Sequence, residues 1–269
     1  MRVELQDTSL FVEDLGSGVP LLLIHGFPFN QEMWRPQIET LSANARVIAL
    51  DLRGHGQSPP TEGPYTMDLL ADDCAGVLKA LKVDQPVVVC GHSMGGYISF
   101  AFYRRHPEMV GGLILAATRA GADSEEGKLN RDKAAQLTEE KGTQPVIDNM
   151  LPIFMATQTY REKPEIVSQV AGIMEKTSTN GMIGALQGIK TRPDSTPILG
   201  QIKVPTLIIH GEKDQIIPLS DSEAMHTAIP DSQLEVIPNA GHLPNLEQAQ
   251  LFNQSVRIFL RKVAHSTVP

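Results

Sequence analysis

The chain lacks the features that mark several classes of protein. Its 269 residues include two cysteines, Cys74 and Cys90, which show no recognisable metal-ligand spacing and form a poor basis for a disulfide framework. No stretch approaches the roughly 18 uninterrupted apolar residues of a membrane helix, and residues 1–7 have no apolar run typical of a secretion signal. We therefore expect two buried thiols, no membrane partner and a cytoplasmic location.

Basic residues are also scarce, with 23 Lys and Arg against 31 Asp and Glu and a formal net charge of −8. This balance favours solubility and argues against a nucleic acid partner, but it says nothing about the substrate. The sequence has no internal repeat and no low-complexity segment. With 269 residues and 41% hydrophobic content, the chain can bury a large core, and we expect one domain with a sizeable insertion.

The most informative segment is residues 87–97, where a β-branched run leads into Gly-His-Ser-Met-Gly and then into a helical pattern. This context is typical of a nucleophile elbow, which lifts a serine hydroxyl clear of the sheet so that a base can take its proton. Gly91 and Gly95 flank the turn at places where a Cβ would collide with neighbouring backbone. Ser93 is therefore the candidate nucleophile, and an ordinary helix-capping serine is the alternative.

Candidates for the acid and the base follow downstream. An apolar strand at residues 204–211 leads into a loop with Asp214, and the apolar stretch 234–237 leads into a loop with His242. Both candidates, like Ser93, fall at the carboxyl ends of strands, where open parallel sheets place their sites. Asp221 and Asp231 remain alternatives for the acid, because aspartate is also favoured in turns.

Five blocks of the sequence, in order, resemble those of the α/β-hydrolase superfamily, and the resemblance covers nearly the whole chain. The blocks are His-Gly-Phe-Pro (25–28), Asp-Leu-Arg-Gly-His-Gly-Gln-Ser (51–58), Gly-His-Ser-Met-Gly-Gly (91–96), Gly-Glu-Lys-Asp (211–214) and Gly-His (241–242). The chain most resembles the small carboxylesterases, the cofactor-free haloperoxidases or perhydrolases, and the 3-oxoadipate enol-lactonases. This resemblance implies no cofactor and no metal, and it implies an oxyanion hole built from the backbone N–H groups of Phe27 and Met94.

The order of apolar patterns predicts an α/β protein with a mainly parallel, doubly wound sheet, as in the α/β-hydrolase fold. Residues 3–13 predict a hairpin of edge strands, residues 21–25 and 46–50 predict central strands, and residues 67–81 predict a helix capped by Thr66. Between about residues 119 and 191 there are several helical patterns and no convincing strand. We therefore expect a core domain of residues 1–118 and 192–269 with a helical cap at residues 119–191.

Serine at the elbow points to acyl transfer. We expect a serine hydrolase that cleaves short-chain carboxylic esters through an acyl-enzyme, with Ser93, Asp214 and His242 as its triad and a small-molecule ester or lactone as its substrate. Enol-lactonase or perhydrolase chemistry on the same triad is an alternative, and so is a non-catalytic binding protein on the same scaffold. The oligomeric state does not follow from the sequence.

The substrate-binding candidates are Pro28 and three methionines of the expected cap, Met150, Met155 and Met182. Flexible methionine side chains suit an apolar acyl pocket, although filling the core is their more usual role. An enol-lactonase would need a cation to hold the substrate carboxylate, and four arginines are open for that role: Arg119, Arg131, Arg161 and Arg192. We expect His25, Arg53 and His55 to brace loops rather than to take part in the chemistry.

Overall fold

The computed structural model describes residues 1–266, and its centre is one eight-stranded sheet. The strands are β1 (Arg2–Glu4), β2 (Ser9–Leu15), β3 (Val19–Ile24), β4 (Ala45–Leu50), β5 (Val87–His92), β6 (Val110–Ala116), β7 (Thr206–Gly211) and β8 (Ser232–Ile237). Their order across the sheet is β1-β2-β4-β3-β5-β6-β7-β8. The β1–β2 and β2–β4 pairs are antiparallel and the remaining pairs are parallel, so the predicted hairpin edge and mainly parallel sheet are confirmed.

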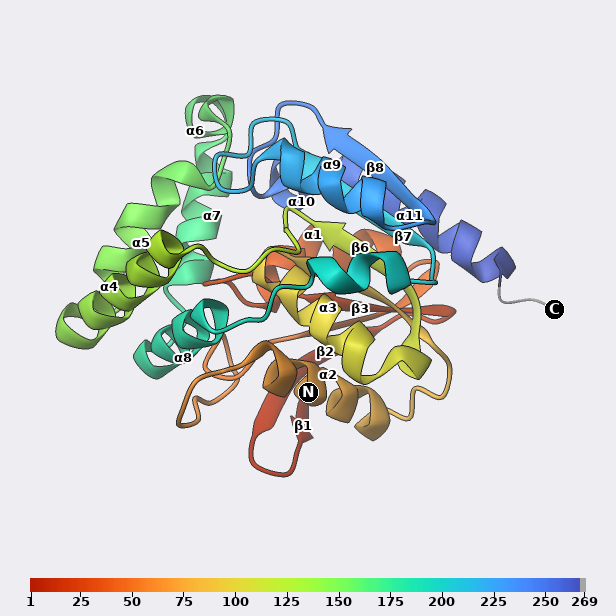
Figure 1. Ribbon diagram of the computed structural model, residues 1–269, viewed down its shortest axis with the longest axis horizontal. Helices are drawn as coiled ribbons and strands as arrows, with labels where there is room; N and C mark the ends of the chain where they lie inside the picture. The colour runs from red at the N-terminus through yellow and green to blue at the C-terminus, as the bar shows by residue number, and fades with distance from the viewer. Residues whose placement is uncertain (267–269) are drawn as a thin grey trace.

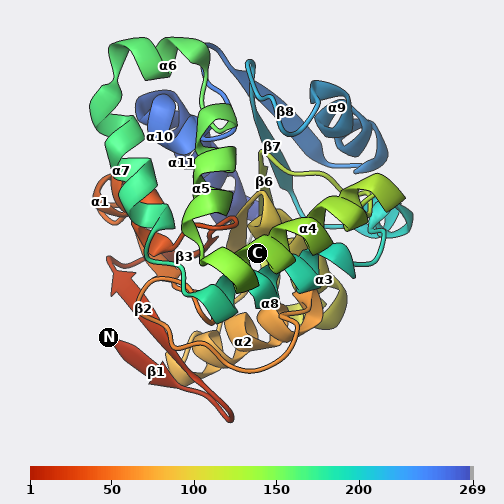
Figure 2. The ribbon, with the colours of Figure 1, turned by 90° about the vertical axis from the view of Figure 1, so that its left-hand side faces the viewer.

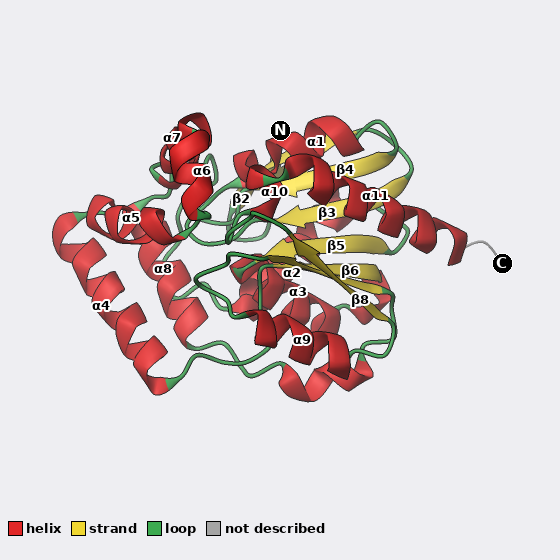
Figure 3. Ribbon diagram, turned by 90° about the horizontal axis from the view of Figure 1, so that it is seen from above, coloured by secondary structure: helices red, strands yellow, loops and turns green. Residues whose placement is uncertain are grey.

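Helices cover both faces of the sheet (Figure 3). One face carries α1 (Arg35–Leu41) and α11 (Ala249–Ser266), with the short α10 (Pro244–Glu247) before α11. The other carries α2 (Met67–Ala80), α3 (Met94–Arg105) and α9 (Leu219–Ala228). Thr66 caps α2 as predicted, since its side chain accepts the amide N–H of Leu69 at 3.1 Å. Short 3-10 turns lie at Gln31–Trp34, Pro107–Met109, Leu151–Ile153 and Thr196–Gln201.

Because helices cover both faces, the central strands read as continuous apolar runs. Every residue of β5 and of β7 is buried. Among residues 1–266, the last strand, β8, pairs with β7 alone, and most of its residues are partly or fully exposed. The chain thus begins at one edge of the sheet, at β1, and α11 carries the other end away from the sheet (Figure 1).

Five helices lie between β6 and β7, and we call residues 119–191 the helical insert. They are α4 (Glu125–Lys141), α5 (Gln144–Met150), α6 (Thr157–Glu162), α7 (Pro164–Met174) and α8 (Thr179–Lys190). Within residues 119–191 the structure has no strand. Figure 2 looks onto the insert, and Figure 3 places α4, α5 and α8 beyond the carboxyl ends of the central strands. The division into a core domain and a cap domain stays a prediction.

Helix α8 presents a row of glycines to the core. A Cβ on Gly181 would lie 2.1 Å from the carbonyl oxygen of Gly54, and one on Gly188 would lie 1.7 Å from that of Tyr65. A Cβ on Gly184 would meet the Tyr65 ring at 2.9 Å. These separations are too short for any side chain, so glycine allows α8 to lie directly against the core backbone.

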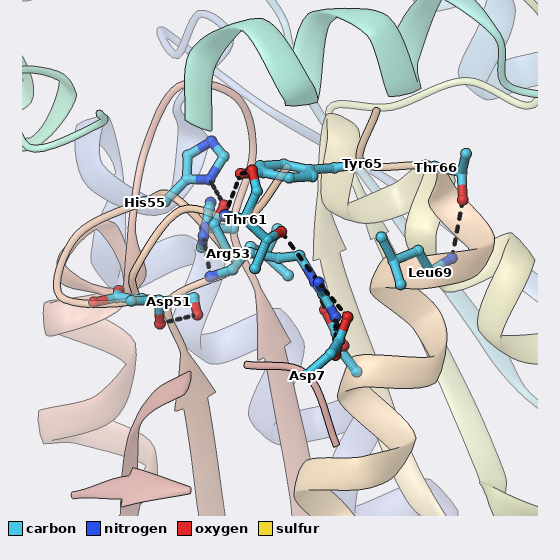
Figure 4. A network of polar contacts seen from close by, with 12 residues as sticks. Asp7, Asp51, Arg53, His55, Thr61, Tyr65, Thr66 and Leu69 are labelled. Carbon is cyan, nitrogen blue, oxygen red and sulfur yellow. Dashed lines mark hydrogen bonds and ion pairs between the residues drawn. The ribbon is translucent and has the colours of Figure 1, made fainter. Parts of the chain in front are cut away.

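The loop that follows β4 is held by a buried arginine (Figure 4). The Arg53 guanidinium donates to both carboxylate oxygens of Asp73, at 2.6 and 2.7 Å, and to Asp7 at 3.0 and 3.1 Å. It also donates to the Thr61 hydroxyl at 3.2 Å. A guanidinium satisfied on several sides in this way fixes the loop to the first hairpin and to α2. Arg53 therefore braces this loop.

Two histidines brace the same region. His25 accepts the amide N–H of Leu52 at 3.0 Å, and His55 donates to the Arg53 carbonyl at 2.9 Å. Both rings are buried, and burial lowers the pKa of His55 to about 4 and that of His25 well below its ordinary value. Each ring therefore stays neutral in the folded protein while the unfolded chain can take up a proton.

The stability of the protein should depend on pH through His55. Its pKa falls from an ordinary 6.5 to about 4 on folding, so its contribution to stability is present above pH 6.5 and is lost as the pH falls toward 4. We predict that the stability difference between the wild type and His55→Gln shrinks by about 2 kcal/mol between roughly pH 7.5 and pH 5. Urea unfolding at both pH values measures it. His226→Gln, at an exposed histidine, is the control, and a pH-independent difference for His55→Gln contradicts the prediction.

Candidate active site

Ser93 occupies a strained turn between β5 and α3. Its backbone has φ +51° and ψ −112°, a conformation that costs a residue with a side chain on the order of 1–3 kcal/mol. Neighbouring groups hold the turn: the Ser93 N–H donates to the Ala116 carbonyl at 2.9 Å, and the Thr118 hydroxyl donates to the Ser93 carbonyl at 2.8 Å. The end of β6 therefore supports the turn, which leaves Ser93 partly exposed.

The glycines around Ser93 are needed because a side chain at their positions would collide with neighbouring atoms. A Cβ on Gly91 would lie 2.2 Å from the carbonyl oxygen of Gly95, and one on Gly95 would lie 2.2 Å from that of Ile24. A Cβ on Gly96 would collide with the side chain of Thr118 at 2.4 Å. The sequence pattern around Ser93 thus reflects close contact between α3, β5 and the ends of β3 and β6.

Asp214 and His242 lie together at the carboxyl ends of β7 and β8. The Nδ1–H of His242 donates to Oδ2 of Asp214 at 2.8 Å, and both side chains are buried. The other carboxylate oxygen, Oδ1, accepts the amide N–H groups of Ile216 and Ile217 at 2.8 and 3.0 Å. Burial acts to raise the pKa of Asp214, but His242 and these two amides outweigh it, so the pKa is lowered and the carboxylate stays ionised.

The alternative acids lie elsewhere. Asp231 pairs with Lys262 at 2.8 Å and is exposed. Asp221 lies in the first turn of α9. Of the three candidate acids, the structure brings Asp214 to the imidazole of His242.

The backbone of His242 is held on both sides. Its N–H donates to the Phe154 carbonyl of the insert at 2.8 Å, and its carbonyl accepts from Nε2 of His92 at 2.6 Å. The Phe154 ring stacks on the imidazole with centroids 5.8 Å apart. Because His92 directly precedes Ser93, its hydrogen bond joins the serine turn to the histidine loop. Burial, together with the neighbouring His242, lowers the pKa of His92 to about 3, so its ring is neutral.

The two residues expected to form the oxyanion hole, Phe27 and Met94, follow neighbouring strands of the sheet. Strands β3 and β5 are parallel neighbours in which Ile24 pairs with Gly91. Phe27 and Met94 each lie three residues beyond those partners, and Met94 begins α3, where amide N–H groups have no partner within the helix. The two N–H groups thus follow neighbouring strand ends, and their convergence on one oxyanion stays a prediction.

The predicted substrate-binding residues occupy different surroundings. Met155 is buried beside the histidine loop, where a Cβ on Gly241 would lie 2.9 Å from the Met155 Cα. Met182 is buried on α8, and its sulfur accepts from the Thr138 hydroxyl of α4 at 3.4 Å. Met150 is half-buried at the end of α5, and the Pro28 carbonyl accepts from the Thr177 hydroxyl at 2.7 Å. Their contact with a substrate stays a proposal.

Three of the four candidate cations share one carboxylate. The buried Asp123 side chain pairs with Arg119 at 3.2 Å, Arg131 at 3.1 Å and Arg192 at 2.9 Å. Burial acts to raise the pKa of Asp123, but Arg131 and Arg192 outweigh it and lower the pKa. The Arg192 guanidinium also lies 4.1 Å from the centre of the Tyr97 ring, whereas Arg161 is exposed. The cluster is thus largely engaged within the protein.

Neither a metal site nor a spanning helix emerges from the described structure. Among residues 1–266, no group of three or more His, Cys, Asp or Glu side chains is arranged to hold a metal ion. Cys74 and Cys90 are buried free thiols, and burial raises the pKa of both. No helix in the same described range is long and apolar enough to cross a membrane.

Comparison with known proteins decides the family. A family model described as alpha/beta hydrolase fold matches residues 19–249. The chain belongs to the α/β-hydrolase superfamily. Its resemblance to that superfamily, drawn from five short blocks, is thereby confirmed.

Relatives of this α/β-hydrolase carry several activities. It is 40% identical to a thermophilic esterase from Thermogutta terrifontis, with a TM-score of 0.96 over 98% of this chain and 99% of that one. It is 30% identical to 3-oxoadipate enol-lactonase 2 from Acinetobacter baylyi, over 90% of this chain and 88% of the relative. A non-heme haloperoxidase from Rhodococcus erythropolis is 31% identical, over 87% of this chain and 89% of the relative. The comparisons thus establish a hydrolase-superfamily enzyme without selecting among these activities.

Two residues that the sequence does not single out hold the candidate site. The ring of His92 carries the hydrogen bond that joins the serine turn to the histidine loop. Glu247 gave no signal, although its carboxylate lies buried beside that loop. Its position five residues after His242 is the only sequence feature that could have drawn attention to it.

The glycine at residue 95 should be indispensable to the elbow. A methyl group there would meet the Ile24 carbonyl oxygen at 2.2 Å, so we predict that Gly95→Ala destabilises the protein by about 2 kcal/mol or more. The control is Gly172→Ala in α7, where a Cβ meets nothing within 4 Å and helix propensity should make alanine stabilising by up to about 1 kcal/mol. Urea unfolding compares the two variants, and equal stabilities would show that α3 can shift to accept the methyl group.

Proposed function

We propose that this α/β-hydrolase is a serine hydrolase that cleaves short-chain carboxylic esters through an acyl-enzyme. Ser93 Oγ attacks the ester carbonyl carbon as His242 Nε2 takes its proton. The same proton then passes to the leaving alcohol oxygen as the C–O bond breaks. Water, activated by the same imidazole, attacks the acyl-serine and releases the carboxylic acid and the free enzyme.

The observation that carries this proposal is the 2.8 Å hydrogen bond between His242 Nδ1 and Asp214 Oδ2. A carboxylate at Nδ1 fixes the tautomer that leaves Nε2 with a free electron pair, which is the form that accepts a proton from serine. It also stabilises the imidazolium that then forms. The His92 bond between the Ser93 turn and the His242 loop supports the same assignment.

The ion pairing of the candidate arginines within the protein favours a neutral ester over an anionic lactone. An enol-lactone carboxylate would need an arginine that is free to bind it, but three of the four candidates, Arg119, Arg131 and Arg192, pair with Asp123. The fourth, Arg161, is exposed on the helical insert. A substrate carboxylate would have to compete with a buried partner that is already in place. Enol-lactonase and perhydrolase activities on the same triad remain the second candidates, and lactone substrates and peracid-forming conditions test them alongside esters.

Removing the proposed nucleophile should abolish hydrolysis. We predict that Ser93→Ala lowers kcat on p-nitrophenyl acetate on the order of 10⁶-fold while the fold is kept, because the acyl-enzyme can no longer form. A fluorophosphonate should label the wild type and leave Ser93→Ala unlabelled. Hydrolysis near the wild-type rate by folded Ser93→Ala would falsify the assignment, and a wild type that is neither labelled nor active would indicate a binding protein.

Acyl-chain preference tests the proposed pocket. If Met150, Met155 and Met182 restrict the acyl group, esters of roughly two to six carbons should have higher kcat/KM than longer ones. Each methylene that fits contributes only about 0.8 kcal/mol, whereas one that clashes costs more. Measuring kcat/KM for p-nitrophenyl esters from acetate to palmitate decides it, and a maximum at about twelve carbons or beyond would mean an open groove.

A further inference from the structure

Glu247 is a buried carboxylate at the end of α10, with 1% of its surface exposed. Its two oxygens face different parts of the chain. Neither oxygen forms an ion pair within residues 1–266, and the nearby Lys163 ammonium donates instead to the Glu247 backbone carbonyl at 2.7 Å. A carboxylate buried without a cation must be held by hydrogen-bond donors, so the identity of those donors shows what the residue is for.

One oxygen holds the loop of the proposed base. Glu247 Oε1 accepts the amide N–H of Gly241 at 2.7 Å and that of Leu243 at 3.3 Å. These two residues flank His242, whose own N–H and carbonyl bind Phe154 and His92. The backbone on both sides of the imidazole is therefore fixed, and half of that fixation comes from Glu247.

The other oxygen holds the helical insert. Glu247 Oε2 accepts the amide N–H of Ala156 at 2.8 Å and the hydroxyl of Thr159 at 2.6 Å. These groups lie at the start of α6, shortly after Phe154, whose carbonyl accepts the N–H of His242. The same short piece of the insert thus reaches the histidine loop twice, once directly and once through this carboxylate.

From this arrangement, and resting on the proposed role of His242, we propose that Glu247 is a positioning residue that couples insert residues 154–159 to the histidine loop. A loosened insert then moves the imidazole and lowers turnover, rather than affecting substrate binding alone. Misplacement of a catalytic group by about 1 Å can cost on the order of 10²-fold in rate. The carboxylate is suited to this task because each of its two oxygens accepts two hydrogen bonds, Oε1 from the histidine loop and Oε2 from the insert.

The test compares Glu247→Gln with two variants of the insert. Glutamine has the shape of glutamate, but its amide group faces two donors, so one side must release. Thr159→Val removes the 2.6 Å bond to Oε2 with little change of shape. Thr157→Val makes the same change at an exposed position of the same helix and is the matched control.

Two readouts are needed for each variant, both taken well below its unfolding temperature. Steady-state kinetics on p-nitrophenyl acetate gives kcat and KM separately. Hydrogen exchange followed by mass spectrometry on peptides spanning residues 238–246 reports how firmly the histidine loop is held, whether or not the protein is an esterase.

We expect Glu247→Gln to lower kcat by about 10- to 100-fold with KM within about threefold, Thr159→Val to lower it by about threefold or more, and both to speed exchange at 238–246. Thr157→Val should match the wild type in both readouts.

The proposal is overturned if Thr159→Val behaves as Thr157→Val does, or if exchange rises while kcat is unchanged, which would make Glu247 a structural residue only. Should Glu247→Gln fail to fold, Thr159→Val decides alone. If the wild type is inactive on all esters, the proposed function is wrong. Hydrogen exchange at residues 238–246 then tests by itself whether Glu247 couples the insert to the histidine loop.

Discussion

The arrangement of the candidate site depends on the backbone conformation of Ser93. A residue with a side chain is held at φ +51°, and such strain persists only where the surroundings fix it. Three contacts supply that fixation: the hydrogen bond from the Ser93 N–H to the Ala116 carbonyl, the hydrogen bond from the Thr118 hydroxyl to the Ser93 carbonyl, and the close approach of Gly95 to Ile24. Because the ends of β3, β5 and β6 meet at this turn, the register of these three strands determines where the candidate nucleophile lies.

Much of this could be predicted from local sequence. Strand runs such as residues 87–92 are short, β-branched and apolar, and helices follow them, α2 with a clear cap in Thr66, so the parallel sheet follows from pattern and alternation. The elbow glycines and the loops with Asp214 and His242 fall directly after strands, and parallel strands bring their carboxyl ends to one edge. A parallel sheet therefore places these loops at the same end of the strands.

What could not be predicted depends on contacts between distant parts of the chain. Glu247 and Ala156 are 91 residues apart, and nothing local marks either as a partner of the other. Likewise, the four open arginines could be ranked only once Asp123 was seen to hold three of them. The insert shows helical patterns in its sequence, but their packing is set by side chains of the core, and periodicity carries no information about that.

The glycine row of α8 has a consequence for how this scaffold can diverge. With Gly181 and Gly188 against the backbone of Gly54 and Tyr65, α8 has no space for a larger residue at these positions and little freedom to slide. Helix α4, by contrast, buries only Thr138 of its seventeen residues. Sequence drift, insertions and laboratory selection for new substrates should therefore accumulate in α4 and its neighbours, while α8 remains the fixed end from which the remainder of the insert can be remodelled.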